Sequence, residues 1–142
     1  MTVTDVDRFL RIVGGLDRFL VEVLDPALDE HGIGREHWRV LRLLEDGTGR
    51  SMGEISAALG LPAATTTRVI DALVARMLVY RRGDPGDRRR VLVHLSEPGH
   101  ESLEHVEAAF RSNSAPLLGR FSKNERRELV QLLERLVGEP AA

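Results

Sequence analysis

The chain has 142 residues, a formal net charge of −2 and a hydrophobic share of 42%, which fits one globular domain with a buried core. It contains no cysteine, which excludes disulfides, thiolate zinc sites, cysteine nucleophiles and thiol redox sensing. No apolar run approaches the roughly 20 residues of a membrane-spanning helix, and the first residues lack a secretory pattern, so we expect no membrane partner and a cytoplasmic location.

The charges are unevenly distributed along the chain. Residues 62–90 contain seven arginines and three aspartates, a net charge of +4, which leaves −6 on the remainder. Five of those arginines fall between Arg81 and Arg90. A concentrated basic segment in an acidic chain is typical of a surface that meets a polyanion.

Helical periodicity dominates the N-terminal half. In residues 4–24 the apolar residues recur at three- and four-residue steps. Pro26 is a candidate for a bend in this helix, and Gly32 is a plausible C-terminal stop. A second helix is expected at about 35–45, before the sequence EDGTG ends it.

The next segment has the spacing of a helix-turn-helix. Ser51 and Glu54 form an S-x-x-E capping box at the start of a short amphipathic helix, which Gly60 ends. Pro62 suits the first turn of the following helix, which is expected to continue to about Arg76.

After that helix the apolar period changes from 3.6 to 2 on either side of GDPGD, which predicts a two-stranded hairpin with a long tip. Two more helices are expected at about 99–118 and 123–137. Pro116 is expected to kink or end the former, and Ser122 with Glu125 caps the latter. The first and last helices have more apolar residues than a surface helix exposes, so we expect a two-fold homodimer.

The helix from Pro62 has small and hydroxyl-bearing residues on its outward side, which makes its N-terminal end slim. A slim end enters the major groove of DNA, where Thr contacts base edges, thymine methyls or phosphates, and Arg contacts guanine or phosphate. The alternative is an ordinary amphipathic helix with a Thr-rich solvent face. The candidate DNA-binding residues here are Pro62, Ala63, Ala64, Thr65, Thr67 and Arg68. Ser51 is first a helix cap, and it is also placed to bond a phosphate.

The hairpin tip is rich in turn-forming residues, with Asp84 and Asp87 able to stabilise the turn through their own backbone. Arginine on a β-tip reaches into a narrow minor groove, where the negative potential is strongest. The alternative is a solvated charge run. The candidate DNA-binding residues of the hairpin are Arg82, Asp87, Arg88, Arg89 and Arg90.

At these residues the chain resembles the MarR family, whose members are winged-helix DNA-binding regulators. LDPALDEHGIGREHWRVLRLLED resembles the end of the family's first helix and its second helix, and SMGEISAALGLPAATTTRVIDALVARMLVYR resembles its helix-turn-helix. DPGDRRRVLVHLSEPG resembles its wing, with Asp-Arg-Arg, alternating apolar residues and Ser/Thr-x-x-Gly. The resemblance implies a mainly α fold with a small β-hairpin wing, as one domain over 1–142. About 35–97 would form the DNA-binding lobe, and about 4–31 and 98–138 the dimerisation helices.

The resemblance also implies a function. Such a protein would bind a pseudo-palindromic operator in double-stranded DNA as a homodimer, usually as a repressor, and would be released by a small, frequently phenolic, ligand. Asp71 would pair with a wing arginine, for which Arg89 is the expected partner, and Asp87 would orient the wing. Two residues depart from the family pattern: Pro62 replaces a polar cap, and Met77 stands where glycine is common, so the turn there is expected to be built differently.

The family often has a ligand pocket between the dimer helices and the DNA-binding lobe, and the candidate lining residues here are Phe19, His37, Trp38, Arg42 and Phe110. A core position fits Trp38 better than a ligand contact does, and solvent positions fit His37 and Arg42 better. Two pairs have the i, i+4 spacing of metal ligands, His100 with Glu104 and Glu101 with His105, but a pair is not a site, so no metal or cofactor is expected.

Two other function classes are weaker fits to the sequence. No nucleophile elbow, phosphate loop or H-E-x-x-H helix is present, so we do not expect an enzyme. A winged-helix protein-interaction module without DNA binding is the alternative function. Its outward face over 64–71 and its wing would be acidic or apolar, and here they are not.

Overall fold

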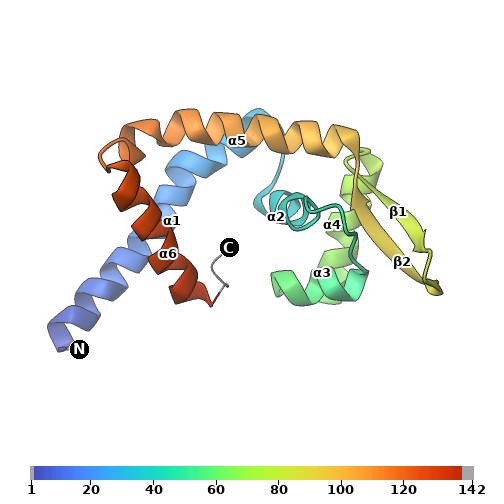
Figure 1. Cartoon of the computed structure of the whole chain (residues 1–142), viewed down its shortest axis with the longest axis horizontal. Helices are drawn as coiled ribbons and strands as arrows, with labels where there is room; N and C mark the ends of the chain where they lie inside the picture. Colours follow the sequence, from blue (N-terminus) through green and yellow to red (C-terminus); the bar gives the residue numbers. More distant parts are fainter. Residues whose placement is uncertain (1, 139–142) are drawn as a thin grey trace.

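The computed structural model describes residues 2–138, which form an arch (Figure 1). Helix α5 spans the top of the arch, helices α2 to α4 with the hairpin form one leg, and α1 and α6 form the other. The elements in chain order are α1 (Val3–Glu30), α2 (Arg35–Leu43), α3 (Met52–Leu59), α4 (Ala63–Ala75), β1 (Val79–Asp84), β2 (Asp87–Leu95), α5 (Glu97–Leu118) and α6 (Lys123–Val137). The expected mainly α architecture with one hairpin wing is confirmed over these residues.

Helix α1 continues through Pro26 to Glu30, beyond the last residue of the 4–24 periodic pattern. Four residues on both sides of the proline are buried, so packing holds the helix together where one backbone donor is missing: Val23, Leu24, Ala27 and Leu28. Gly32, the expected stop, has a φ of +62° just beyond the helix. The N-terminal two thirds of α1 contribute no buried residue.

The core lies in the leg that contains the hairpin and beneath the adjoining half of α5. Its buried side chains come from helices α1 to α5 and from both strands, and α6 contributes none. They include Leu28, Leu41, Leu44, Ile55, Ile70, Leu73, Val79, Val93, Leu103 and Val106. This core fixes the position of α4 and of the base of the hairpin.

Both strands of the hairpin contact the rest of the lobe, β1 against α4 and β2 against α3. β1 and β2 pair antiparallel, with Val79 opposite Leu95, and the register becomes irregular between Gly83 and Asp84. Arg50 adds an isolated bridge to Val93, with N···O distances of 3.1 and 2.7 Å. Arg50, two residues before α3, is therefore joined to β2 by one isolated bridge outside the two-stranded sheet.

Met77 takes the left-handed conformation that favours glycine, with a φ of +58°. The expectation of a differently built turn is therefore wrong. The Met77 carbonyl accepts a hydrogen bond from the Ser96 hydroxyl at 2.6 Å, and that hydroxyl also accepts from the Gly99 N–H at 3.0 Å. A Cβ on Gly99 would lie 2.1 Å from the Leu78 carbonyl oxygen. The Ser-x-x-Gly motif thus joins the start of the wing to the start of α5.

Candidate nucleic-acid interface

Helix α4 presents the face that the sequence predicted. Thr66, Val69, Ile70 and Leu73 are buried in the core. The exposed residues of α4 include Ala63, Ala64, Thr67, Arg68 and Asp71, and Thr65 is half-buried. Pro62 is the N-cap residue and provides no side-chain cap, so the first backbone N–H groups of α4 lack a side-chain acceptor at that position.

Asp71 binds a wing arginine, but the partner is Arg81 and not Arg89. The distance from Arg81 Nη2 to Asp71 Oδ1 is 2.5 Å. Arg81 is on β1, which leaves directly from the end of α4, so its side chain stays beside the helix. Arg89 lies near the tip of β2, and its backbone N–H donates to Asp87 Oδ1 at 3.0 Å. The expected Asp71–Arg89 pair is therefore wrong.

Arg90, a predicted DNA contact, forms an ion pair with Glu54 of α3. Glu54 also caps its own helix: its carboxylate accepts from the Ser51 N–H at 2.9 Å, and its N–H donates to the Ser51 hydroxyl at 3.2 Å. The Ser51 N–H and, more weakly, Arg90 lower the pKa of Glu54. One carboxylate thus joins the first helix of the helix-turn-helix to the wing.

The seven arginines of the basic segment fall into two groups. Arg76, Arg81 and Arg90 bind acceptors within the chain; Arg76 donates to the Gly32 carbonyl at 2.6 Å. In contrast, four arginine side chains make no ion pair or hydrogen bond with any residue between 2 and 138: Arg68, Arg82, Arg88 and Arg89. All four are exposed.

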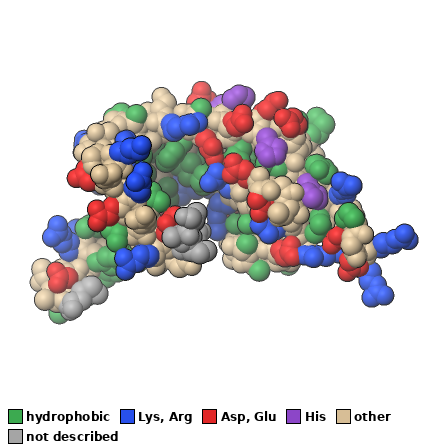
Figure 2. Space-filling view, viewed as in Figure 1, with side chains coloured by type: hydrophobic (Ala, Val, Ile, Leu, Met, Phe, Trp, Pro, Cys, Tyr) green, Lys and Arg blue, Asp and Glu red, His purple; other side chains and the backbone are tan. Residues whose placement is uncertain are grey.

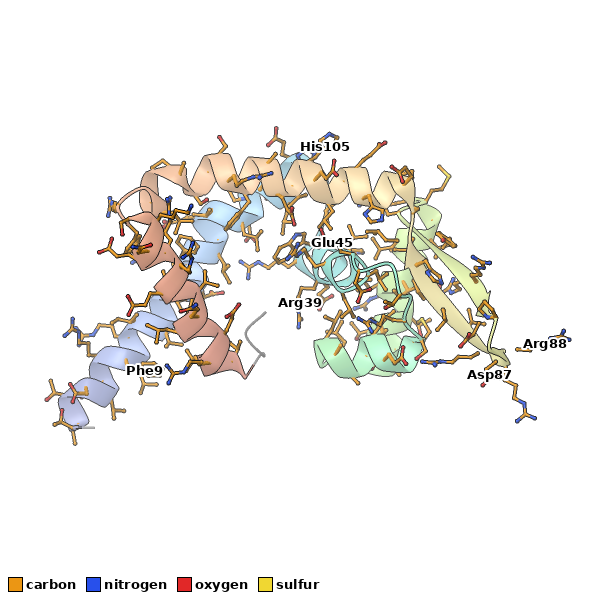
Figure 3. All side chains as sticks on the ribbon, in the orientation of Figure 1. Phe9, Arg39, Glu45, Asp87, Arg88 and His105 are labelled. Carbon is orange, nitrogen blue, oxygen red and sulfur yellow. The ribbon has the colours of Figure 1, made fainter. Side chains whose placement is uncertain are left out.

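Three of these unpaired cations are on the hairpin, which projects from the lobe, and Arg68 is on the exposed side of α4. Figure 3 shows Asp87 and Arg88 at the tip of the wing, with the Arg88 side chain extending away from the body. Basic side chains project from the same end of the molecule in Figure 2. Because no carboxylate of the described chain neutralises these four arginines, they are available to phosphates and to groove edges.

A cavity of about 360 Å³ lies between α1, α2 and α5. Three predicted ligand residues line it, namely Trp38, Arg42 and Phe110, whereas Phe19 and His37 do not. Arg42 donates to Glu45 at 2.8 Å and to Glu107 at 2.6 Å. The indole N–H of Trp38 is buried, with no hydrogen-bond partner among residues 2–138. His37 lies outside the cavity, where burial, followed by the charge of Arg76, lowers its pKa.

The two i, i+4 pairs in α5 that have the spacing of metal ligands are not joined by a third ligand among the described residues. Within the described chain no group of three or more His, Asp or Glu side chains could hold a metal ion. The His105 ring instead stacks on His31, with centroids 5.6 Å apart. Of the helices over residues 2–138, none has the length and apolar character needed to cross a membrane.

Comparison with known proteins identifies the family. Residues 31–90 match the model of the MarR family. The transcriptional repressor MprA of Escherichia coli K12 is 31% identical over 120 residues, which are 83% of this chain and 68% of MprA. The chain belongs to the MarR family of transcriptional regulators. A further relative, the putative transcriptional regulatory protein for the hcr operon of Thauera aromatica, is 29% identical over 97 residues, and the chain spans only 58% of its length.

Solved structures show the same MarR fold. RV1404 from Mycobacterium tuberculosis superposes with a TM-score of 0.80 at 25% identity, over 96% of this chain and 97% of that one. A mutant of MepR from S. aureus, crystallised bound to an oligodeoxyribonucleotide, has a TM-score of 0.66 at 20% identity, with 92% and 96% covered. These likenesses establish the winged helix-turn-helix arrangement of α3, α4 and the hairpin.

Proposed function

We propose that this MarR-family protein is a repressor that binds a pseudo-palindromic operator as a homodimer. In this proposal α4 enters the major groove and the wing enters the adjacent minor groove. The observation that carries the proposal is the group of unpaired arginines on these two elements, in a chain whose net charge is −2. The repressor name of MprA and the oligodeoxyribonucleotide bound to MepR support it. A protein that binds an operator in this way would act with the DNA, in the cytoplasm.

The proposed division of labour follows from the contacts. Arg68 is placed for the major groove, and Arg82, Arg88 and Arg89 for the minor groove and its phosphates. Thr65, Thr67 and the two small residues after Pro62 would approach base edges, while Ser51 and the start of α3 would face a phosphate. Arg81 and Arg90 would hold the wing in position. A protein-interaction module would leave the four unpaired arginines without a polyanionic partner.

The homodimer is supported by the apolar surface of the other leg. α1 and α6 together expose a large set of apolar side chains, and α6 buries none of its residues within residues 2–138. A second copy related by a two-fold axis would cover this surface. Its members are Phe9, Leu10, Ile12, Val13, Leu16, Leu20, Val21, Leu129, Val130, Leu132, Leu133, Leu136 and Val137.

The cavity between the two legs supports release by a small effector. Its volume of about 360 Å³ is within the range of small-molecule sites. Phe110 and Trp38 offer flat apolar surfaces, which would pack against an aromatic ligand such as a phenol. Because α1 and α5 meet α2 here, a ligand would bear on the junction between the dimer helices and the DNA-binding lobe.

A selection experiment tests the proposal. The purified protein is incubated with a pool of random DNA duplexes, bound DNA is amplified, and affinity for the enriched sequence is measured by fluorescence anisotropy at several salt concentrations. We expect an inverted repeat and a steep loss of affinity with salt. Equal binding to all duplexes, or none, would overturn the proposal.

A further inference from the structure

Three consecutive threonines in the first two turns of α4 have three different environments. Thr66 is buried, and its hydroxyl donates to the Pro62 carbonyl at 3.1 Å. Thr67 is exposed, but its hydroxyl donates to the Ala63 carbonyl at 3.0 Å. Thr65 is half-buried, and its hydroxyl has no hydrogen-bond partner within residues 2–138.

The Thr67 hydroxyl has one proton, and the helix backbone takes it. What this exposed residue offers to an incoming molecule is therefore chiefly its methyl group. Ala63 and Ala64 lie four and three residues before Thr67, on the same helix face, and both are exposed. These three residues form a methyl patch beside the unpaired Arg68.

A methyl patch can distinguish thymine from the other bases by contact with its methyl group. In the major groove only thymine presents a methyl group, at C5, while the other base edges offer hydrogen-bond donors and acceptors. A protein surface of methyl groups without a free hydroxyl proton gains most binding free energy by packing against the thymine methyl group. A free hydroxyl, as on Thr65, suits a phosphate or a polar base edge instead.

We propose that Thr67 determines specificity by packing its methyl group against a thymine methyl in each operator half-site, and that Thr65 contributes through its hydroxyl. The inference rests on the proposed DNA-binding function and adds which base α4 selects and by which atoms. It also assigns different roles to two threonines that the sequence alone treats alike.

The test combines single-atom changes in DNA and protein. In the sequence enriched by the wild-type protein, each thymine is replaced in turn by uracil, which lacks only the C5 methyl. Binding is measured for the wild type and for Thr67→Ser, Thr67→Val, Thr65→Ser and Thr65→Val. Serine keeps the hydroxyl and removes the methyl, whereas valine keeps the methyl and removes the hydroxyl. Thermal unfolding of each variant checks that α4 is intact.

We expect one thymine per half-site at which uracil weakens wild-type binding by about fourfold, the effect of one buried methyl group. Thr67→Ser should lose a similar factor at each half-site, so its total loss in the dimer is the square of that factor, and it should become insensitive to uracil there, while Thr67→Val keeps both affinity and sensitivity. At Thr65 we expect the opposite ranking of the two substitutions. Thr65→Val weakens binding by about fivefold per half-site, the effect of one hydrogen bond, and Thr65→Ser does not weaken it.

The outcomes separate this inference from the function on which it rests. If the selection enriches no sequence, both fail. If a sequence is enriched and Thr67→Ser binds it as the wild type does, or keeps the same uracil sensitivity at every thymine, only the assignment of Thr67 fails. Equal losses for Thr67→Val and Thr67→Ser would likewise overturn it, because the hydroxyl would then matter as much as the methyl.

Discussion

Asp71 on α4 and Arg81 on β1 form an ion pair, with 2.5 Å between Oδ1 and Nη2. The pair joins the part of the molecule proposed for the major groove to the part proposed for the minor groove. It also removes Arg81 from the set of free cations, so removing Arg81 and removing Arg89 should have different consequences for DNA binding.

Salt dependence should separate the two arginines. Arg89→Gln is expected to weaken operator binding and to reduce the slope of log affinity against log salt by about 0.9 for each phosphate that is no longer neutralised. Arg81→Gln is expected to weaken binding by loosening the wing while leaving the slope nearly unchanged. Asp71→Asn should reproduce the effect of Arg81→Gln, and the double variant should be no weaker than either single one. Equal slopes for the two arginine variants would contradict the assignment.

Glu54 should have two separable roles. Glu54→Gln keeps a capping side chain at the start of α3 but loses the charge that holds Arg90, so we expect faster amide exchange in β2 and unchanged helix stability. Glu54→Ala removes both interactions, so α3 should also be less stable. Hydrogen exchange monitored by mass spectrometry resolves the two segments, and unchanged exchange in β2 for both variants would show that Arg90 does not need Glu54.

Met77 should limit the stability of the fold. At a φ of +58° a side chain is strained, and Met77 is 73% exposed, so it has little packing to lose. Met77→Gly is expected to raise the free energy of unfolding by up to about 1 kcal/mol, because relief of strain exceeds the added entropy of the unfolded chain. Urea denaturation measures this, with Met77→Ala as the control that keeps the strain and should give no gain.

Histidine 37 should make stability fall in mild acid. Burial, reinforced by the Arg76 charge and opposed by Glu36, lowers the pKa of His37 below its ordinary value of about 6.5. As the pH falls below 6.5, the unfolded chain takes up the proton before the folded chain does, so the contribution of His37 is full above that pH and is lost on acidification. We expect His37→Asn to flatten the decrease in unfolding free energy between pH 7.5 and 5.5. An equal decrease in the variant would rule out His37 as its source.

The apolar face of α1 and α6 should control the oligomeric state. Leu16→Glu and Leu133→Glu place a charge on the surface proposed for the second copy and should yield monomers by light scattering. Val91→Glu is the matched control, because Val91 is a similarly exposed apolar residue on the wing and should leave the dimer intact. Dimers in all three variants would place the interface elsewhere.

The sequence predicted the elements that local signals specify. The boxes at Ser51 and Ser122 mark the helix starts that the structure shows, because a capping side chain and the backbone N–H that donates to it are three residues apart in any helix. The turn at GDPGD and the change of period marked the hairpin. The outward face of α4 followed from periodicity alone.

Contacts between elements were harder to predict. Five arginines between residues 81 and 90 were possible partners for Asp71, and only the path of β1 and the irregular register near Gly83 decide among them. The continuation of α1 past Pro26 depends on burial of residues around it, which local propensity does not contain. Phe19 and His37 were wrongly placed at the cavity because helix rotation relative to a neighbour is a tertiary property.

The bridge between Arg50 and Val93 has a consequence for regulation. Together with the Arg81–Asp71 and Arg90–Glu54 pairs, it joins the wing to α3 and α4 at three points, so we expect the parts that would touch DNA to move together as one block. An effector would then gain little by deforming that block. In the proposed dimer the effector would instead change the distance and tilt between two such blocks. The half-site spacing that the dimer fits, rather than its base preference, would then be the property that the effector changes.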